Sequence, residues 1–151
     1  MKLEQALQTT KFENDQHKAL LNVLYTGYWF KTQTADILKK YSLTSEQFNV
    51  MRILKGMHPK PMCVKNIASR MIEKSSNVPR ILDRMVLKGF AERIQSPEDK
   101  RETLVNLTEK GIKQLGQASS ELSEHTKKIV SLTDKEAVQL NDLLEAMRKI
   151  D

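Results

Sequence analysis

The sequence predicts a mainly α-helical protein with one small β hairpin, in the order α-α-α-α-β-β-α-α. Apolar residues recur at intervals of three and four along most of the chain, which is the period of a helix. One short run, at 103–107, alternates apolar and polar side chains, and a turn signal at 96–99 precedes it. Aromatic residues make up 5% of the chain and charged residues 29%, which is typical of a soluble helical protein.

The first 42 residues predict a polar arm followed by one long helix. Residues 1–14 are polar, and we expect them to be frayed or only partly ordered. From Asp15 to Tyr41 there is no proline, and the apolar stripe is wider than one small core needs. A partner subunit is the expected cover for that surplus, so residues 1–42 are interpreted as a dimerisation helix.

The next stretch predicts a helix with a well-marked beginning. Thr44 and Gln47 have the spacing of a capping box, and Leu43 and Phe48 can form a hydrophobic staple around it. The pattern continues to Gly56, a plausible last residue, and two prolines then break the chain.

Two short helical patterns follow in tandem, at 64–72 and 78–86, joined by a link at 73–77. Two helices joined by a tight turn indicate a helix-turn-helix. Pro79 would cost roughly 3 kcal/mol inside a helix, so it predicts that the second helix begins at 75–77, with Ser75 or Ser76 as its cap.

The remaining residues predict the hairpin and two further helices. Strands are expected at 90–94 and 103–107, and Thr108 is a good N-cap for a helix that runs to about residue 130. A second capping box at 132–136 opens the last helix. We therefore divide one compact domain into 1–42, a lobe at 43–108 and dimerisation helices at 109–151.

The positive charge of the chain is concentrated around the hairpin. The formal net charge is +6, and residues 60–113 alone contain twelve Lys and Arg against seven Asp and Glu. This local excess indicates a polyanionic partner.

The sequence contains few residues in patterns typical of disulfides, metal sites or catalytic sites. The single cysteine, Cys63, forms no intrachain disulfide, and His17, His58 and His125 have no second ligand at metal-site spacing. We expect no metal, no cofactor and no enzymatic activity, because no nucleophile or phosphate-binding motif occurs. No leader or long apolar run is present, so we expect no membrane contact and a cytoplasmic location.

One motif makes the interpretation specific. Asp99, Arg101, Leu107, Thr108 and Gly111 form the pattern D-x-R-x-x-x-x-x-L-T-x-x-G, which follows 82–85 and 88–90 at a characteristic distance. Through this motif and these two ranges, residues 15–150 resemble the MarR family of winged helix-turn-helix transcriptional regulators. The resemblance implies a homodimer that binds double-stranded DNA at a pseudo-palindromic operator and represses transcription.

The resemblance also assigns roles to single residues. The helix from about 76 to 88 resembles the recognition helix, with Arg80 as a candidate reader of guanine. Arg101 would enter the minor groove, Asp99 would orient its guanidinium, and Lys100 and Arg93 would contact phosphates. Pro79 stands where relatives often have a threonine. The full set of DNA-contact candidates is Lys65, Ser75, Ser76, Asn77, Arg80, Arg84, Arg93, Asp99, Lys100 and Arg101.

Three alternatives stay open at this point. Arg80 and Arg84 are also compatible with surface ion pairs to Asp83 or Glu73. Tyr28 and Trp29 fit core and dimer packing, whereas with Arg52 they would form a pocket for a small aromatic or phenolic effector. The whole lobe is also compatible with a protein–protein interaction module that does not bind DNA.

Overall fold

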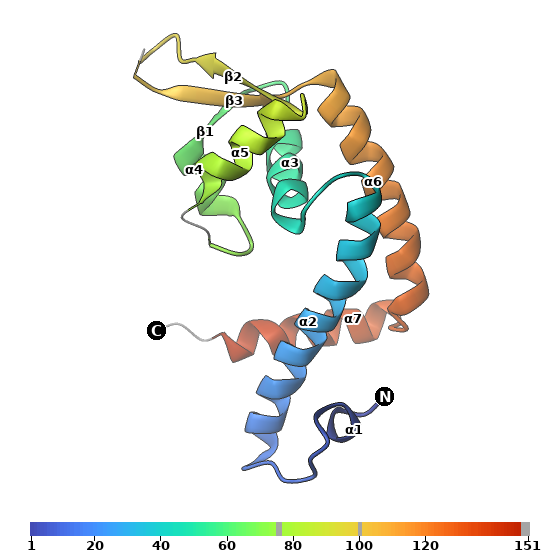
Figure 1. Cartoon of the computed structure of the whole chain (residues 1–151). Helices are drawn as coiled ribbons and strands as arrows, with labels where there is room; N and C mark the ends of the chain where they lie inside the picture. Colours follow the sequence, from blue (N-terminus) through green and yellow to red (C-terminus); the bar gives the residue numbers. More distant parts are fainter. Residues whose placement is uncertain (75–76, 100, 149–151) are drawn as a thin grey trace. The chain divides into compact units, whose positions relative to one another are not determined.

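A computed structural model of the chain describes residues 1–74, 77–99 and 101–148 (Figure 1). The contacts fall into two compact units, Met1–Ala118 and Ser119–Asp151, and each is described by itself. The elements in chain order are α1 (Leu3–Leu7), α2 (Asp15–Lys40), α3 (Ser45–Met57), β1 (Met62–Cys63), α4 (Val64–Arg70), α5 (Val78–Leu87), β2 (Ala91–Gln95), β3 (Thr103–Leu107), α6 (Glu109–Ile129) and α7 (Asp134–Met147). The mainly helical class with a small β element is confirmed.

The core of the first unit lies where α3, α4 and α5 meet the sheet. Helix α3 contacts both short helices and β3, and α4 and α5 contact each other. Eight of the least exposed side chains come from these elements, as the apolar spacing predicted. They are Val50, Met51, Leu54, Ile67, Val78, Leu82, Met85 and Val105, all 1% exposed or less.

The sheet has three antiparallel strands in the order β1-β3-β2, one strand more than the sequence predicted. The predicted hairpin is present, with Ala91 opposite Leu107 and Gln95 opposite Thr103. The additional strand β1 has only two residues, and Met62 pairs with Val105 on the other side of β3. In Figure 1 the hairpin of β2 and β3 extends beyond α4 and α5.

Helix α5 begins slightly later than predicted. Its N-cap is Asn77 and its first residue is Val78, whereas the prediction was a start at 75–77. The two predicted caps, Ser75 and Ser76, lie outside the described residues. Pro79 stands in the first turn, where a missing N–H is tolerated, so the reason for the prediction was correct although the start was early.

Glycine ends helix α5 in a conformation that few other residues adopt. Gly89 has a φ of +71°, its N–H donates to the Val86 carbonyl at 2.8 Å, and the Phe90 N–H donates to the Met85 carbonyl at 2.9 Å. This pair of bonds is a Schellman motif, which turns the chain directly from the helix into β2.

The N-terminal arm is more ordered than predicted. Residues Leu3–Leu7 form the short helix α1, and Leu3 is only 6% exposed. Lys18 of α2 binds Glu4 at 2.5 Å, so an ion pair joins the arm to the long helix. Residues 9–14 form no helix or strand, so the expectation of a partly ordered arm is confirmed, whereas the helix at Leu3–Leu7 and the burial of Leu3 were not predicted.

Candidate nucleic-acid interface

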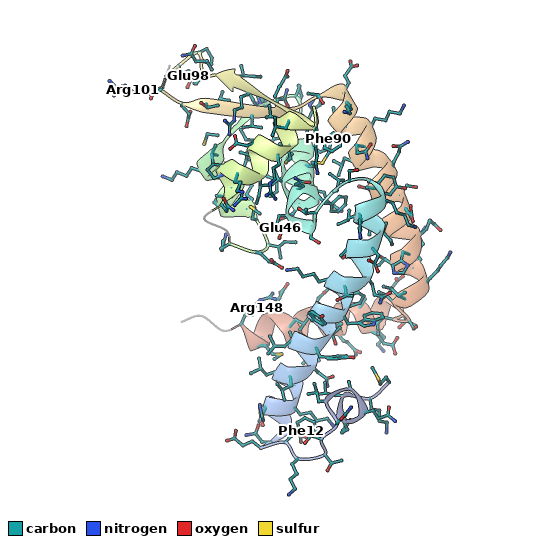
Figure 2. The ribbon with its side chains drawn as sticks, viewed as in Figure 1. Phe12, Glu46, Phe90, Glu98, Arg101 and Arg148 are labelled. Atoms are coloured by element: carbon teal, nitrogen blue, oxygen red, sulfur yellow. The ribbon has the colours of Figure 1, made fainter. Side chains whose placement is uncertain are left out.

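The tip of the hairpin is a turn that is held by its own side chains. The Ser96 hydroxyl accepts hydrogen bonds from the Glu98 and Asp99 N–H groups, both at 3.3 Å, and the Ser96 side chain is buried. The Glu102 N–H donates to the Asp99 carbonyl at 2.9 Å. These bonds fix the path of the chain around the tip, where Figure 2 shows Arg101 and Glu98 at the outer end of the hairpin.

Asp99 shapes this turn through the backbone. One of its carboxylate oxygens accepts a hydrogen bond from the Arg101 N–H at 2.9 Å, which is an Asx turn. The sequence predicted an orienting bond to the Arg101 guanidinium, but the bond that the structure describes goes to the main chain. Arg101 is exposed, and its neighbour Lys100 lies outside the described residues.

The first turns of α5 border a polar hollow of about 240 Å³. Arg80 and Arg84, one helical turn apart, both line it. The hollow reaches the beginning of α3, which closes its other side. Its lining is Thr44, Glu46, Gln47, Asn77, Arg80, Ile81 and Arg84.

The carboxylates that the sequence offered as partners for these arginines are paired elsewhere. Asp83 binds Arg93 at 2.7 Å, and Glu73 binds Lys31 at 2.8 Å. Within the described part of the chain neither Arg80 nor Arg84 forms an ion pair. Both guanidiniums are therefore available to an anion, whereas Arg93, predicted as a phosphate contact, already has a carboxylate partner.

Helix α4 contributes exposed cations at both ends. Lys65 stands in its first turn and Arg70 in its last, and both side chains are exposed, as a phosphate contact requires. Cys63 occupies the N-cap position, without a cap hydrogen bond from its thiol.

The end of α5 is tied to neighbouring elements by residues that the sequence analysis missed. The Lys88 ammonium donates to the Ser42 carbonyl at 2.6 Å and to Oε1 of the buried Gln47 at 3.0 Å. The Lys110 ammonium in turn donates to the Lys88 carbonyl at 2.7 Å. The position of Lys88 at a helix C-terminus was visible in the sequence, but its hydrogen-bond partners could not be predicted because they are distant in sequence.

The residues predicted for an effector line neither the polar hollow beside α5 nor a smaller one bordered by Met71 and Ile72. Tyr28 is 70% exposed on α2, and Trp29 packs edge-on against Phe30 with ring centroids 4.9 Å apart. Arg52 is exposed on α3. A second, smaller cavity of about 100 Å³ is lined instead by Ser45, Glu46, Asn49, Met71, Ile72 and Glu73.

The charges at this smaller cavity are balanced by local contacts. The hydrogen bond that the Lys31 ammonium donates to Glu73 raises the pKa of Lys31, so this ammonium stays charged. A backbone hydrogen bond at Glu46 and a bond from Thr44 lower the pKa of Glu46. Two carboxylates beside mainly apolar atoms do not favour an anionic aromatic ligand here.

The described residues form neither a metal cluster nor a membrane-spanning helix. Among those described, no group of three His, Cys, Asp or Glu is placed to hold a metal ion. Over the same ranges, none of the helices combines the length and apolar character that crossing a bilayer requires.

Comparison with known proteins gives consistent matches. The MarR family model matches residues 43–103. The chain is 30% identical over 122 residues to the HTH-type transcriptional regulator YpoP of Bacillus subtilis, covering 80% of this chain and 82% of that protein. It is 31% identical over 114 residues to the HTH-type transcriptional repressor IacR of Pseudomonas putida, covering 74% and 66%. With the regulator YkoM of B. subtilis the identity is 33%, but the match spans only 46% of that relative.

Solved structures share the fold. A MarR-like transcription regulator from Bacillus cereus superposes with a TM-score of 0.78 at 24% identity, covering 87% of this chain and 94% of that one. The organohalide-sensing regulator RdhR in its 2,4-dichlorophenol-bound form superposes with a TM-score of 0.77 at 23% identity. The match covers 89% of this chain and 80% of that one. Taken with the helix-turn-helix, the hairpin and the similarity to YpoP, these matches show that the chain belongs to the MarR family of transcriptional regulators, a family of DNA-binding proteins rather than enzymes.

Proposed function

We propose that this protein is a homodimeric, sequence-specific repressor that binds double-stranded DNA at a pseudo-palindromic operator. One observation carries the proposal: α5 and the hairpin tip both offer arginines that form no ion pair with any carboxylate of the described residues. Arg80 and Arg84 line a polar hollow beside α5, and Arg101 is exposed at the tip. The repressor role is supported by the similarity to IacR.

We assign the two kinds of contact to different elements of the lobe. Helix α5 would enter the major groove, where an arginine can form two hydrogen bonds to guanine. The hairpin would lie over the adjacent minor groove, where a narrow and negative channel favours the guanidinium of Arg101. In a two-fold symmetric dimer the half-sites would lie about 10 bp apart.

Selection of bound fragments from random duplex DNA is the primary test. The expected product is a two-fold symmetric sequence with half-sites about 10 bp apart. Affinity should fall steeply with salt, because each phosphate contact adds about −0.9 to the slope of log K against log salt. A flat salt dependence with no enriched sequence would favour a protein–protein interaction module instead.

Arg101→Ala tests the hairpin separately. Loss of a groove contact should weaken binding to the selected duplex about fivefold or more, while the variant still sediments as wild type does. Lys55→Ala, which removes an exposed cation from α3, is the matched control and should bind as wild type does. Equal affinities for wild type and Arg101→Ala would refute the minor-groove role.

A small aromatic or phenolic effector is the last part of the proposal. It is supported by the 2,4-dichlorophenol-bound form of RdhR and by the aromatic residues of α2. Tyr28, Trp29 and Arg52 are the proposed contacts. Titration of 2,4-dichlorophenol and of benzoate should change the fluorescence of Trp29, the one tryptophan, and the affinity for DNA. No change in either signal would remove these residues from the proposal.

A further inference from the structure

An ion pair joins the middle of α5 to the first strand of the hairpin. Nη2 of Arg93 lies 2.7 Å from Oδ1 of Asp83, and the two side chains are 41% and 54% exposed. Asp83 immediately precedes Arg84, which lines the polar hollow. The pair therefore connects the element proposed for the major groove to the element proposed for the minor groove.

The register of the sheet explains why Arg93 reaches the helix. Arg93 is directly opposite Val105 in the antiparallel pairing of β2 with β3, so the two side chains leave the same face of the sheet. Val105 is 0% exposed, which identifies this face as the one that packs on the core. Strand β2 is at the edge of the sheet, and an inward-pointing cation there needs a partner on the element beneath it. Asp83 of α5 is that partner.

This geometry disagrees with a phosphate contact from Arg93. A guanidinium matched by a carboxylate at 2.7 Å contributes little net charge to a polyanion. The pair also neutralises Asp83, which would otherwise repel DNA from the middle of the recognition helix. Asp83 stays neutralised only while Arg93 remains bound to it, so the surface of α5 depends on the two residues staying together.

We propose that Asp83 and Arg93 are a positioning pair that fixes the offset between α5 and the hairpin, so that α5 and Arg101 reach adjacent grooves together. The inference rests on the proposed DNA-binding function, and it adds residues that act without touching DNA. Operator binding, which needs both grooves at one spacing, depends on this offset. Binding to duplex DNA of arbitrary sequence depends on the total charge of the protein and does not depend on this offset.

Asp83→Asn gives the sharpest test, because electrostatics and positioning predict opposite signs. Removing a carboxylate that faces DNA should tighten binding if only charge matters. If the pair positions the hairpin, binding to the selected duplex weakens about two- to fivefold, the range for a half-exposed ion pair, while affinity for a scrambled duplex does not fall.

Arg93→Gln distinguishes positioning from a phosphate contact. Positioning predicts weaker binding to the selected duplex with an unchanged salt slope, whereas loss of a phosphate contact would reduce the slope by about 0.9. The exchanged pair Asp83→Arg/Arg93→Asp should restore the ratio of selected to scrambled affinity. Lys55→Gln, the charge-matched control for Arg93→Gln, should leave that ratio unchanged.

Several outcomes would overturn the inference: tighter binding by Asp83→Asn, a reduced salt slope for Arg93→Gln, or no restoration by the exchanged pair. Urea unfolding of the free protein gives an independent reading, because the two substitutions should be non-additive in a double-mutant cycle. If wild type binds no duplex DNA, the proposed function fails, and the cycle still decides whether the pair holds the hairpin on α5. Additive effects would show that it does not.

Discussion

At the residue scale, the surroundings of Gly111 explain why the L-T-x-x-G part of the motif ends in a glycine. A Cβ at this position would lie 2.0 Å from the Phe90 carbonyl oxygen and 2.9 Å from its carbon, so the first turn of α6 touches the backbone that enters β2. Thr108 makes the same junction from the other side. Its N–H donates to the Phe90 carbonyl at 3.2 Å, and its hydroxyl donates to the Gly89 carbonyl at 2.6 Å.

This junction supports the proposed binding surface from within the fold. The Thr108 hydroxyl also accepts a hydrogen bond from the Gly111 N–H at 3.0 Å, which caps α6. One threonine and one glycine thus hold together the end of α5, the beginning of β2 and the beginning of α6. The sequence predicted the cap, but it did not predict why residue 111 has to lack a side chain.

Gly111→Ala should therefore destabilise the protein strongly. The clash is with backbone atoms, which cannot rotate away, so we expect a loss of about 3 kcal/mol or more in the free energy of unfolding by urea. Gly116→Ala is the control in the same helix, because no atom lies within 4 Å of its Cβ position. That variant should gain about 0.5–1 kcal/mol. If both substitutions prove equally harmless, α6 does not approach Phe90 as described.

At the element scale, the helices that were predicted well are those with local signals. Thr44 accepts from the Gln47 N–H at 3.2 Å, and Thr133 accepts from the Glu136 N–H at 3.3 Å, each within a complete capping box. Such bonds span three residues, so the amino-acid pattern alone reveals them. Strand β3 was predicted at its observed bounds, 103–107, because a turn signal precedes it and the cap residue Thr108 follows it directly.

The elements that were missed or misplaced depend on distant residues. Strand β1 exists only because Met62 pairs with Val105, more than forty positions along the chain. Helix α1 depends on the burial of Leu3 and on the ion pair between Glu4 and Lys18. A two-residue strand and a five-residue helix are too short to show any periodicity.

The candidate site also contains some features that local sequence predicted and others that depend on distant residues. The exposed position of Arg101 at a hairpin tip followed from a turn signal between two strands. The partner of Arg93 did not, because Asp83 is on a helix and the pairing depends on which face of the sheet carries Arg93. Charge and spacing indicated the proposed interface, while the proposed division between contacting and positioning residues required coordinates.

At the scale of the whole molecule, both units leave apolar side chains uncovered. On α2 these include Leu24, 60% exposed, and Tyr28, 70% exposed. Helix α7 has no buried residue, and Leu143 is 65% exposed. Rows of apolar side chains on two helices are more than a monomer ordinarily exposes to water. A second copy of the chain is the proposed cover for both, consistent with the surplus apolar stripe of α2.

Leu24→Glu tests this assembly. Burying an unpaired carboxylate between subunits is unfavourable, so the variant should sediment as a monomer at concentrations where wild type is a dimer. Operator binding should then fall far more than binding to scrambled duplex, because a monomer reaches only one half-site. Leu87→Glu introduces the same charge at an 86% exposed position of α5 and should leave the dimer intact. A Leu24→Glu variant that still sediments as a dimer would exclude α2 from the interface, and a monomeric wild type would refute the homodimer.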